Sequence, residues 1–265
     1  MLTATLNPLM VLSRRRFQLT VRTPRELLVP LVTPLLFALV IAPALKTALH
    51  TDTSYEAFVA IGTVGLLVPL NTMFSGLSVI VDREQGAQRE LLAAPVPRSL
   101  LVLANLLVAL AITGLQVAVL IAAAAARGIH FDASTGGVLW FLGATSLLGV
   151  GMYGLAEILA AKVPKQEEYI ARVPAVAIVP WFLAGSLFPI SAMPTALTWV
   201  AKFLPLTHAL AVMRYGLLGD AAGLHNIWGS VDPAGAAALS LTVTAFFAVA
   251  LTIASVRIFT RSAVR

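Results

Sequence analysis

The sequence lacks cysteine altogether, and this absence removes several kinds of chemistry. None of the 265 residues is cysteine, so the chain has no disulfide framework, no thiolate metal site and no cysteine nucleophile. Charged residues are scarce too, at 11% against about a quarter in a soluble domain. Hydrophobic residues make up 59% of the chain, and its mean hydropathy is +0.91. So few charges cannot cover so much apolar mass in water, which excludes an ordinary cytosolic protein.

Sequence signatures of enzymes are missing as well. The chain contains no G-x-x-x-x-G-K-[ST] motif, so it carries no P-loop and is not expected to hydrolyse ATP by that route. It has no H-E-x-x-H motif, and its four histidines are too dispersed for a metal site. The aspartates are single and far apart, which counts against a membrane-embedded transferase that holds a metal diphosphate. We therefore expect no catalytic residue, metal or bound cofactor in this chain.

Six long apolar blocks account for much of the sequence. They lie at residues 27–45, 57–81, 99–126, 136–161, 173–190 and 234–256. Each is close to or above the roughly 17 to 25 residues with which an α-helix crosses a bilayer. Prolines in the first and fifth blocks are tolerated where neighbouring helices satisfy the freed backbone groups. We predict an all-α membrane protein with six transmembrane helices in one domain, residues 1–265.

The basic residues predict how these helices are oriented. With both termini in the cytoplasm, the inner segments are 1–26, 82–98, 162–172 and 257–265, and they equal the outer segments in total length. Of the 18 Lys and Arg residues, 14 lie in inner segments and 4 in outer ones, as the positive-inside rule requires. Arg also outnumbers Lys, which hints at a GC-rich bacterial genome. We expect a multi-pass protein of a bacterial plasma membrane, in contact with lipid and with both termini cytoplasmic.

The net charge of +6 does not indicate nucleic acid binding, because the basic residues are spread over four edges and form no single stripe. Within the blocks, Glu157 is the only charged residue. We expect its carboxylate to extend to the interface, with a proton relay as the alternative. Asn71, Asn105 and Gln116 lie in the second and third blocks. They either line a substrate path or form hydrogen bonds between helices.

The N-terminal segment, residues 1–26, has the pattern of a basic surface helix. Asn7 and Pro8 suit the N-cap and first turn, and Thr23-Pro24 suits the end. One sector of the helix collects basic and amide side chains and another collects apolar ones. The basic and amide side chains are Arg14, Arg15, Gln18 and Arg22, and the apolar ones are Met10, Phe17 and Val21. We predict an interfacial helix on the cytoplasmic surface of the membrane.

Residues 82–98 are predicted to form a short helix that contacts a protein. Asp82 is a suitable N-cap, and Pro95 and Pro97 require the helix to end near Ala94. Three acidic residues balance three basic ones, whereas the other inner segments are net positive. A neutral helix with an apolar tip favours a protein over anionic lipid. The side chains expected to carry the contact are Glu84, Ala87, Arg89, Glu90 and Leu91.

Residues 186–214 are apolar but are interrupted by prolines and by Lys202. Helical pieces that enter the outer leaflet and return explain this pattern, because irregular backbone is tolerated at membrane depth only where protein or a water-filled cavity covers it. A seventh complete span is the alternative. It would place Arg257, Arg261 and Arg265 outside, against the positive-inside rule. We therefore predict a re-entrant segment.

At these residues the chain resembles the membrane subunits of type-2 ABC exporters, the permease family that includes daunorubicin-resistance-type drug exporters. The resemblance covers the basic N-terminal helix, the six blocks and two motifs. These motifs are the Glu84-to-Pro95 loop with its Glu90-Leu-Leu stretch, and the order Phe188-Pro189, Met193-Pro194, Leu204-Pro205-x-Thr207 and Arg214.

The resemblance implies a half-size permease that forms a homodimer, or a dimer with a related permease. It also implies two copies of a separate ATP-binding cassette ATPase subunit, which would hold ATP and Mg. By the same resemblance, residues 82–98 are the coupling helix and residues 186–214 are the outer gate. The gate residues are then expected to be Phe188, Pro189, Met193, Pro194, Pro205 and Arg214.

We therefore predict ATP-driven export of an apolar or amphipathic substrate, such as a drug, a lipid or a glycolipid. An ion- or proton-coupled secondary carrier is the second hypothesis, and a membrane-embedded lipid transferase is the third. A carrier is expected to show inverted repeats and charged groups at the middle of the membrane. The sequence has no convincing repeat, and Glu157 is shallow.

Overall fold

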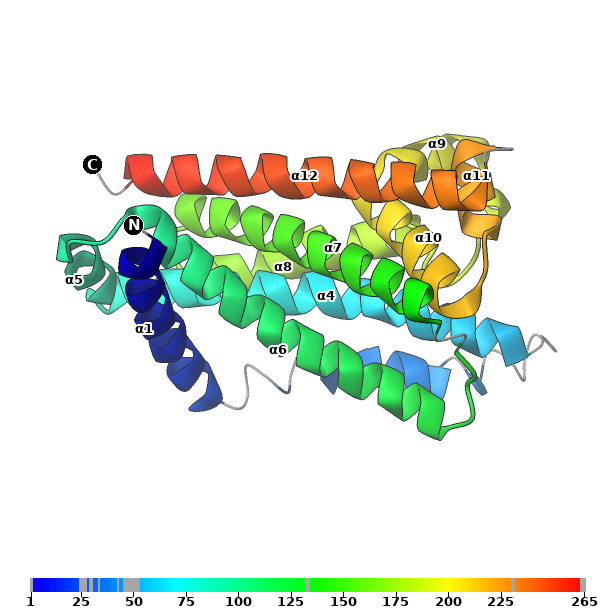
Figure 1. Cartoon of the computed structure of the whole chain (residues 1–265), viewed down its shortest axis with the longest axis horizontal. Coiled ribbons are helices and arrows are strands. Elements are labelled where there is room, and N and C mark those ends of the chain that lie inside the picture. The colour runs from blue at the N-terminus through cyan, green and yellow to red at the C-terminus, as the bar shows by residue number, and fades with distance from the viewer. Residues whose placement is uncertain are drawn as a thin grey trace.

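The computed structural model is a bundle of long helices. It describes residues 2–23, 28, 31–32, 34–41, 43–44, 53–131, 134–229 and 232–262, and none of these lies in a strand. Four of the described helices are long and apolar enough to cross a membrane: α4 (Thr53–Glu84), α6 (Arg98–Ala126), α7 (Thr135–Lys162) and α12 (Pro233–Ser262). They correspond to the second, third, fourth and sixth predicted blocks. Helix α7 packs against both α4 and α12 and joins them into one layer (Figure 1).

The first and fifth blocks differ from this simple match. The first, residues 27–45, lies in part outside the described residues, and its described part includes the π-helical turn η1 (Phe37–Ile41). The fifth block is displaced, since α8 runs from Gln166 to Leu183. The predicted end at Ile190 is wrong, because Gly185 adopts a φ of 77° that stops the helix. The loop predicted at 162–172 is correspondingly reduced to residues 163–165.

The segment after α8 consists of short helices. These are the 3-10 turn η2 (Ile190–Ala192), α9 (Thr195–Phe203), α10 (Pro205–Leu218) and α11 (Ala222–Trp228). Helices α9 and α10 meet at an angle of 83°, the geometry of a broken span or of a re-entrant loop. All three α-helices lie at the end of the bundle where α12 begins, opposite the short helix α5 (Ala87–Ala93) and the C-terminus (Figure 1). Re-entry and the number of six spans stay predictions.

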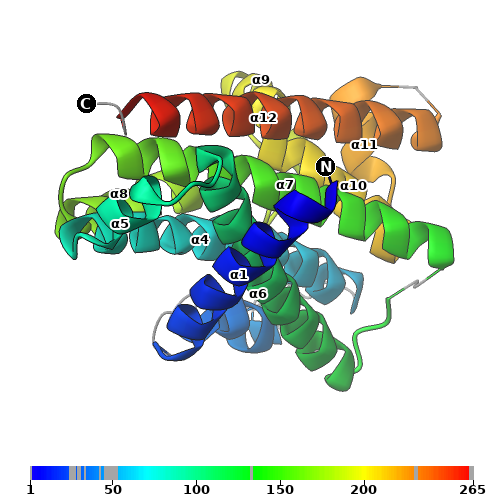
Figure 2. The same cartoon turned by 60° about the vertical axis from the view of Figure 1, so that its left-hand side comes forward.

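Helix α1 (Leu2–Val21) lies across α6 at the end of the bundle that carries α5 (Figures 1 and 2). It begins before Asn7, so the predicted N-cap is wrong and Pro8 lies inside the helix. Met10 and Phe17 are 70% and 49% exposed, whereas Arg16 is only 7% exposed. The helix thus turns apolar side chains outward and one arginine inward, and its place at the membrane surface stays a prediction.

The core of the bundle contains large aromatic side chains whose polar atoms are all bonded. Trp181, Tyr153 and Tyr169 are the largest fully buried side chains. The Trp181 indole donates to the carbonyl of Gly62 at 2.7 Å, and the Tyr169 hydroxyl donates to the carbonyl of Met73 at 2.6 Å. Because each polar tip has a partner, the rings can be buried without a desolvation penalty for the donor. These bonds fix α8 against α4.

Candidate coupling and gating sites

The predicted coupling helix is present as α5, but it begins differently from the expectation. Helix α4 continues through Asp82 to Glu84, so Asp82 does not cap the short helix. The break is made by Gly86, whose φ of 79° lies in the left-handed region that glycine adopts without strain. Helix α5 then ends at Ala93, where Ala94 is extended before the prolines.

The side chains expected to contact an ATPase divide into two groups. The exposed ones are Glu84, Arg89 and Glu90, and the half-buried ones are Ala87 and Leu91. Glu84 accepts a hydrogen bond from Gln166 Nε2 at 2.6 Å, which links the end of α4 to the start of α8. Leu91 packs on the hydrophobic core. Helix α5 is thus anchored through its apolar side and presents a charged side to water, and its contact with an ATPase stays a prediction.

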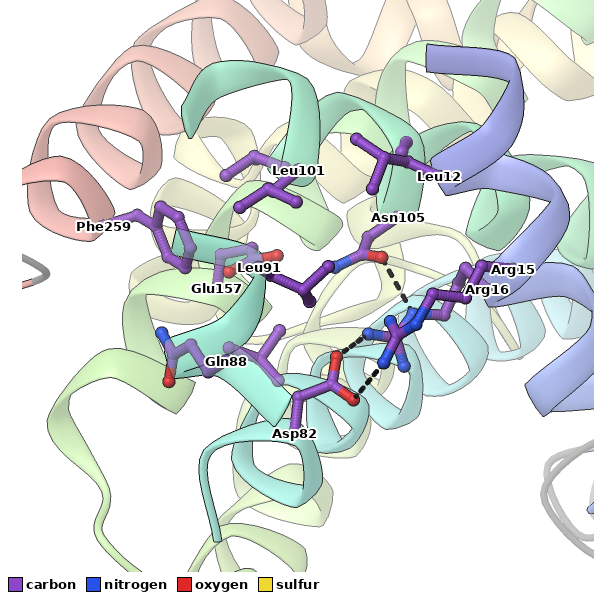
Figure 3. A pocket seen from close by; sticks show the side chains of 13 residues that line it. Leu12, Arg15, Arg16, Asp82, Gln88, Leu91, Leu101, Asn105, Glu157 and Phe259 are labelled. Carbon is purple, nitrogen blue, oxygen red and sulfur yellow. Dashed lines mark hydrogen bonds and ion pairs between the residues drawn. The ribbon is translucent and has the colours of Figure 1, made fainter. Parts of the chain in front are cut away.

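An ion pair that sequence reasoning missed lies beneath α5. Arg16 of α1 and Asp82 of α4 are each 7% exposed, and Arg16 Nη2 pairs with Asp82 Oδ2 (Figure 3). Arg16 Nε also donates to Asn105 Oδ1 of α6 at 2.8 Å, and Arg15 Nη2 lies 3.5 Å from Asp82 Oδ1. The signal was available in the sequence. Three consecutive arginines span about 200° of a helix at about 100° per residue, so they cannot all share one narrow solvent-facing sector.

The end of α4 that leads into α5, which we call the inner end after its predicted orientation, is also tied to α7. Arg83 donates to the carbonyls of Ala160 at 3.1 Å, Val163 at 2.6 Å and Pro164 at 3.2 Å. Carbonyls in the last turn of a helix have no partner within that helix, and positive charge is favourable there. Arg83 therefore completes the carboxyl end of α7 and holds α4 beside it.

Glu157 does not extend to the interface as expected. It is 3% exposed and accepts a hydrogen bond from the hydroxyl of Tyr153, which lies one turn earlier on α7. The prediction is wrong because this hydroxyl offers a partner inside the bundle, so the carboxylate need not reach water. Glu157 also lines the cavity of ≈ 30 Å³ that lies between α5 and the Arg16–Asp82 pair. The proton relay, the alternative for Glu157, is untested.

At the opposite end, Arg214 of α10 fastens the short helices to α4. Its side chain is buried, and its Nη1 donates to the carbonyl of Gly185 at 2.9 Å. Nη2 donates to the carbonyls of Ser186 at 3.0 Å and Phe58 at 3.3 Å, and the guanidinium stacks 3.3 Å from the centroid of the Phe58 ring. A Cβ on Gly62 would lie 2.1 Å from the carbonyl oxygen of Ser186. Only glycine allows the chain to approach α4 so closely.

The other predicted gate residues lie at the boundaries of the short helices. Pro189 precedes η2, Pro194 precedes α9, and Pro205 is the first residue of α10. Proline is suited to these positions because its missing N–H would have no helical partner there. Phe188 is exposed and Met193 is half-buried. The structure therefore gives these prolines a local structural reason, and gating by this segment stays a prediction.

The three residues proposed to line a substrate path lie on α4 and α6. Asn71 donates to the hydroxyl of Thr113, and Asn105 accepts from Arg16, so both form hydrogen bonds between helices. Gln116 is buried on α6, one turn after Thr113. Of the two alternatives left open by the sequence, the structure shows interhelical bonding for Asn71 and Asn105, and a path along them stays a prediction.

A groove of ≈ 700 Å³ lies between α6 and α7 toward the end that carries α10. Most of its walls are apolar, including Val117, Ile121 and Phe141, and its polar groups include Thr113, Thr145 and Ser146. The Thr145 hydroxyl is buried without a hydrogen-bond partner among the described residues. An apolar groove of this size with a few polar groups suits an apolar or amphipathic molecule. The described residues contain no group of three or more His, Asp and Glu side chains that could hold a metal ion.

Comparison with known proteins agrees with these features. A family model described as ABC-2 type transporter matches residues 7–218. The chain is 27% identical over 209 residues to a protein of Porphyra purpurea named as transport permease ycf38, covering 77% of this chain and 72% of that protein. It is 34% identical over 113 residues to nodulation protein J of Rhizobium meliloti (strain 1021), covering 39% of this chain and 43% of that protein. The region of the family match includes most of α1 and all of α4 to α10.

Proposed function

The chain belongs to the ABC-2 type transporter family and is a permease subunit, the membrane component of an ABC transporter; from this premise we propose that it exports an apolar or amphipathic substrate with energy supplied by a separate ATPase subunit. The observation that carries the proposal is α5. It is a short helix with a charged exposed side at one end of the bundle, in a chain that has no P-loop of its own. Energy from ATP then has to enter through a protein contact.

The proposed assembly contains two permeases, either two copies of this chain or this chain with a related permease, and two ATPase subunits that bind ATP and Mg. Its orientation is supported by the 14 of 18 basic residues in the inner segments. The segments assigned to the inside, α5 and the C-terminal end of α12, lie at the same end of the bundle (Figure 1). In this arrangement α5 and both termini face the cytoplasm of a bacterial cell, where ATP is available.

The substrate class is supported by the groove between α6 and α7. Apolar walls would hold the hydrocarbon part of a drug, lipid or glycolipid, and the unpartnered hydroxyl of Thr145 would bind a polar part. Leu142, which lines the groove, is 51% exposed, so the groove opens onto the outside of the bundle. A membrane-dissolved molecule could therefore enter from the side, without first passing through water.

The partner is tested by crosslinking from α5. Because the chain has no cysteine, Ala87→Cys introduces a unique thiol at the start of α5, and Ser134→Cys introduces one at the opposite end of the bundle. Each full-length variant is expressed in its own host, treated with a thiol-to-amine crosslinker, and purified. We expect Ala87→Cys to capture a polypeptide that contains a G-x-x-x-x-G-K-[ST] motif, identified by mass spectrometry, and Ser134→Cys to capture none.

Two results would contradict the proposal. Capture of the same P-loop protein from both positions would show non-specific proximity. Capture of no P-loop protein from Ala87→Cys, at normal abundance of the permease, would remove α5 from the energy pathway.

The substrate class is tested with a fatty acid that carries a photoactivatable diazirine. Labelling of Ala118 and Ala122, which line the groove, is expected to saturate as the probe concentration rises. Labelling of Leu239, an exposed residue of α12, should rise in proportion to the probe because lipid alone covers it. If the groove residues behave like Leu239, the groove holds only bulk lipid and the proposed substrate class loses its support.

A further inference from the structure

The strongest unassigned feature of the molecule is the cluster formed by buried Arg16 and Asp82 with half-buried Asn105. It joins three helices that are far apart in the sequence: α1, the inner end of α4, and α6 (Figure 3). Residues 16 and 82 are 66 positions apart, and residues 16 and 105 are 89 apart. Arg15, also on α1, adds a second and more exposed ion pair to Asp82 at 3.5 Å. The buried contacts of Arg16 are therefore central to where α1 lies.

A buried ion pair is poor evidence for stability alone. Removing two charges from water costs much of what their attraction returns, and buried pairs are best attested as devices that fix register or act as switches. Loss of one partner is different, because the remaining charge is left buried and uncompensated. The pair therefore makes the docked position of α1 strongly dependent on both residues being in place.

The cluster lies directly on the path from α5 into the bundle. Asp82 precedes the end of α4 by two residues, and Gly86 is the turn that leads into α5. Gln88 and Leu91 of α5 line the same cavity of ≈ 30 Å³ as Arg16, Asp82 and Asn105 (Figure 3). A force that displaces α5 therefore acts on the end of α4 that carries Asp82 before it reaches the rest of the bundle.

A second carboxylate lines this cavity. Glu157 of α7 is held there by the hydroxyl of Tyr153. Arg16 thus faces one carboxylate that it contacts directly and another across the cavity. If the direct pair opens, a second possible acceptor for Arg16 is therefore already present in the cavity.

We propose that Arg16, Asp82 and Asn105 form an inner latch, which holds α1 across α6 and opens when the ATPase displaces α5, so that α1 becomes free to move relative to α4 and α6. This role rests on the proposed function, in which α5 contacts the ATPase. Arg16 and Asp82 are positioning residues in this mechanism, and neither is expected to touch the substrate or ATP.

The latch is tested by a distance measurement in the purified permease–ATPase complex. Spin labels on Gln18→Cys of α1 and Arg261→Cys at the end of α12, both exposed, report the position of α1 by pulsed electron resonance. With the native pair we expect one narrow distance distribution without nucleotide, and a shift when a non-hydrolysable ATP analogue is added. Asp82→Asn and Arg16→Gln should each broaden the nucleotide-free distribution and abolish the shift.

Two further variants separate the latch from general misfolding. Arg15 lies 3.5 Å from Asp82 and would repel an arginine there, so the reversal Arg16→Asp with Asp82→Arg is made together with Arg15→Gln. It restores opposite charges and should recover a narrow distribution. Arg172→Gln breaks an exposed ion pair with Glu168, 3.7 Å long, and should change nothing. The latch is overturned if Asp82→Asn and Arg16→Gln leave the distances unchanged, or if the reversal fails to recover what the single variants lose.

The same experiment distinguishes failure of the latch from failure of the proposed function. Absence of any ATPase in the complex of the unmodified chain would contradict the proposed function, and the latch would then be judged on the nucleotide-free distances alone. An ATPase that binds and shifts the distance equally in the native, Asp82→Asn and Arg16→Gln proteins would contradict the latch and leave the proposed function intact.

Discussion

The two ends of the bundle are each fastened by a buried arginine, but the atoms that accept its hydrogen bonds differ in kind. At the inner end, Arg16 pairs with the carboxylate of Asp82, a side chain that can rotate away or exchange partners. At the outer end, Arg214 donates to the carbonyls of Phe58, Gly185 and Ser186, which belong to the backbone. Those acceptors cannot leave unless α4 or the end of α8 moves. The end that carries α5 is thus fastened through side-chain acceptors, and the opposite end through backbone acceptors.

Gly62 and Gly76 of α4 show the same difference between backbone and side-chain contacts at the two ends of the bundle. Toward the outer end, a Cβ on Gly62 would meet the backbone oxygen of Ser186 at 2.1 Å. Toward the inner end, a Cβ on Gly76 would meet the hydroxyl of Tyr169 at 2.4 Å, the far end of a side chain. Backbone contacts give way only when whole segments shift, whereas Tyr169 can move if its hydroxyl gives up the bond to the carbonyl of Met73. The same helix is therefore packed against backbone at one end and against a hydrogen-bonded side chain at the other.

The largest effect on stability is expected from removal of the outer arginine. Arg214→Met deletes three hydrogen bonds from a charged donor and leaves carbonyls unpaired in the interior. Since bonds to charged groups contribute about 1.5–3 kcal/mol each, we expect a loss of at least about 3 kcal/mol in unfolding free energy. The measurement is chemical unfolding in detergent micelles. The control is Arg172→Met, whose guanidinium is exposed. Equal stability of the two variants would show that the outer end does not depend on Arg214.

A smaller loss of stability is expected when Gly62 and Gly76 are each replaced by alanine. These two variants compare the packing at the two ends of α4. Gly62→Ala should cost about 1–3 kcal/mol, as overpacking of a well-packed core does, because the backbone at Ser186 has to move. Gly76→Ala should cost less, since only the tip of the Tyr169 side chain has to shift and not the backbone, although this strains its bond to Met73 and Ala156 Cβ at 2.9 Å limits the space.

Thermal unfolding of both variants is compared with that of Gly114→Ala, where no atom lies within 4 Å of the added Cβ. This control should be neutral or slightly stabilising, because alanine favours helix over glycine. A larger loss for Gly76→Ala than for Gly62→Ala would contradict this comparison of the two ends.

Most of the fold could be predicted from the sequence, because long apolar blocks and single prolines each act on the segment in which they lie. Blocks of apolar residues mark α4, α6, α7 and α12, and prolines mark the start of α10 and the end of α5. The end of α8 was placed too late because the apolar residues continue to Ile190, whereas Gly185 ends the helix; Pro174 and Pro180 lie inside it. Composition cannot distinguish a tolerated proline from a terminating one, because the difference lies in what neighbouring helices supply.

The candidate site was less predictable, because its contacts join residues far apart in the sequence. The order of motifs located α5 and the segment before α12, but not the partners of Arg16 or Arg214. Asp82 was assigned to a cap because capping is a local rule, and the structure uses its carboxylate for Arg16 instead. Glu157 was expected at the interface because the sequence does not show which way Tyr153 points. Pairings of this kind depend on how the helices are packed, which no single segment specifies.

The smallest effect on stability is expected for a substitution at the exposed Glu84, which should nevertheless weaken binding of the ATPase. Glu84→Gln keeps an oxygen that can accept from Gln166, and exposed substitutions of this kind usually change stability by no more than about 0.5 kcal/mol. If Glu84 forms part of the contact with the ATPase, the loss of its charge should lower the amount of ATPase that co-purifies. If the Glu84 carboxylate contributes more than about 1 kcal/mol to that contact, its loss should lower the affinity for the ATPase by roughly fivefold or more.

The matched control for Glu84→Gln is Glu168→Gln, which removes an equally exposed carboxylate from α8 at the same end of the bundle. Both variants should unfold at the temperature of the native chain, so any difference in retained ATPase reports the interface alone. Retention of ATPase by Glu168→Gln and loss by Glu84→Gln would place the contact at the junction of α4 and α5. This junction carries Asp82, so energy would then enter the bundle beside the pair that Asp82 forms with Arg16. Equal retention by both variants would move the contact away from Glu84 and separate it from that pair.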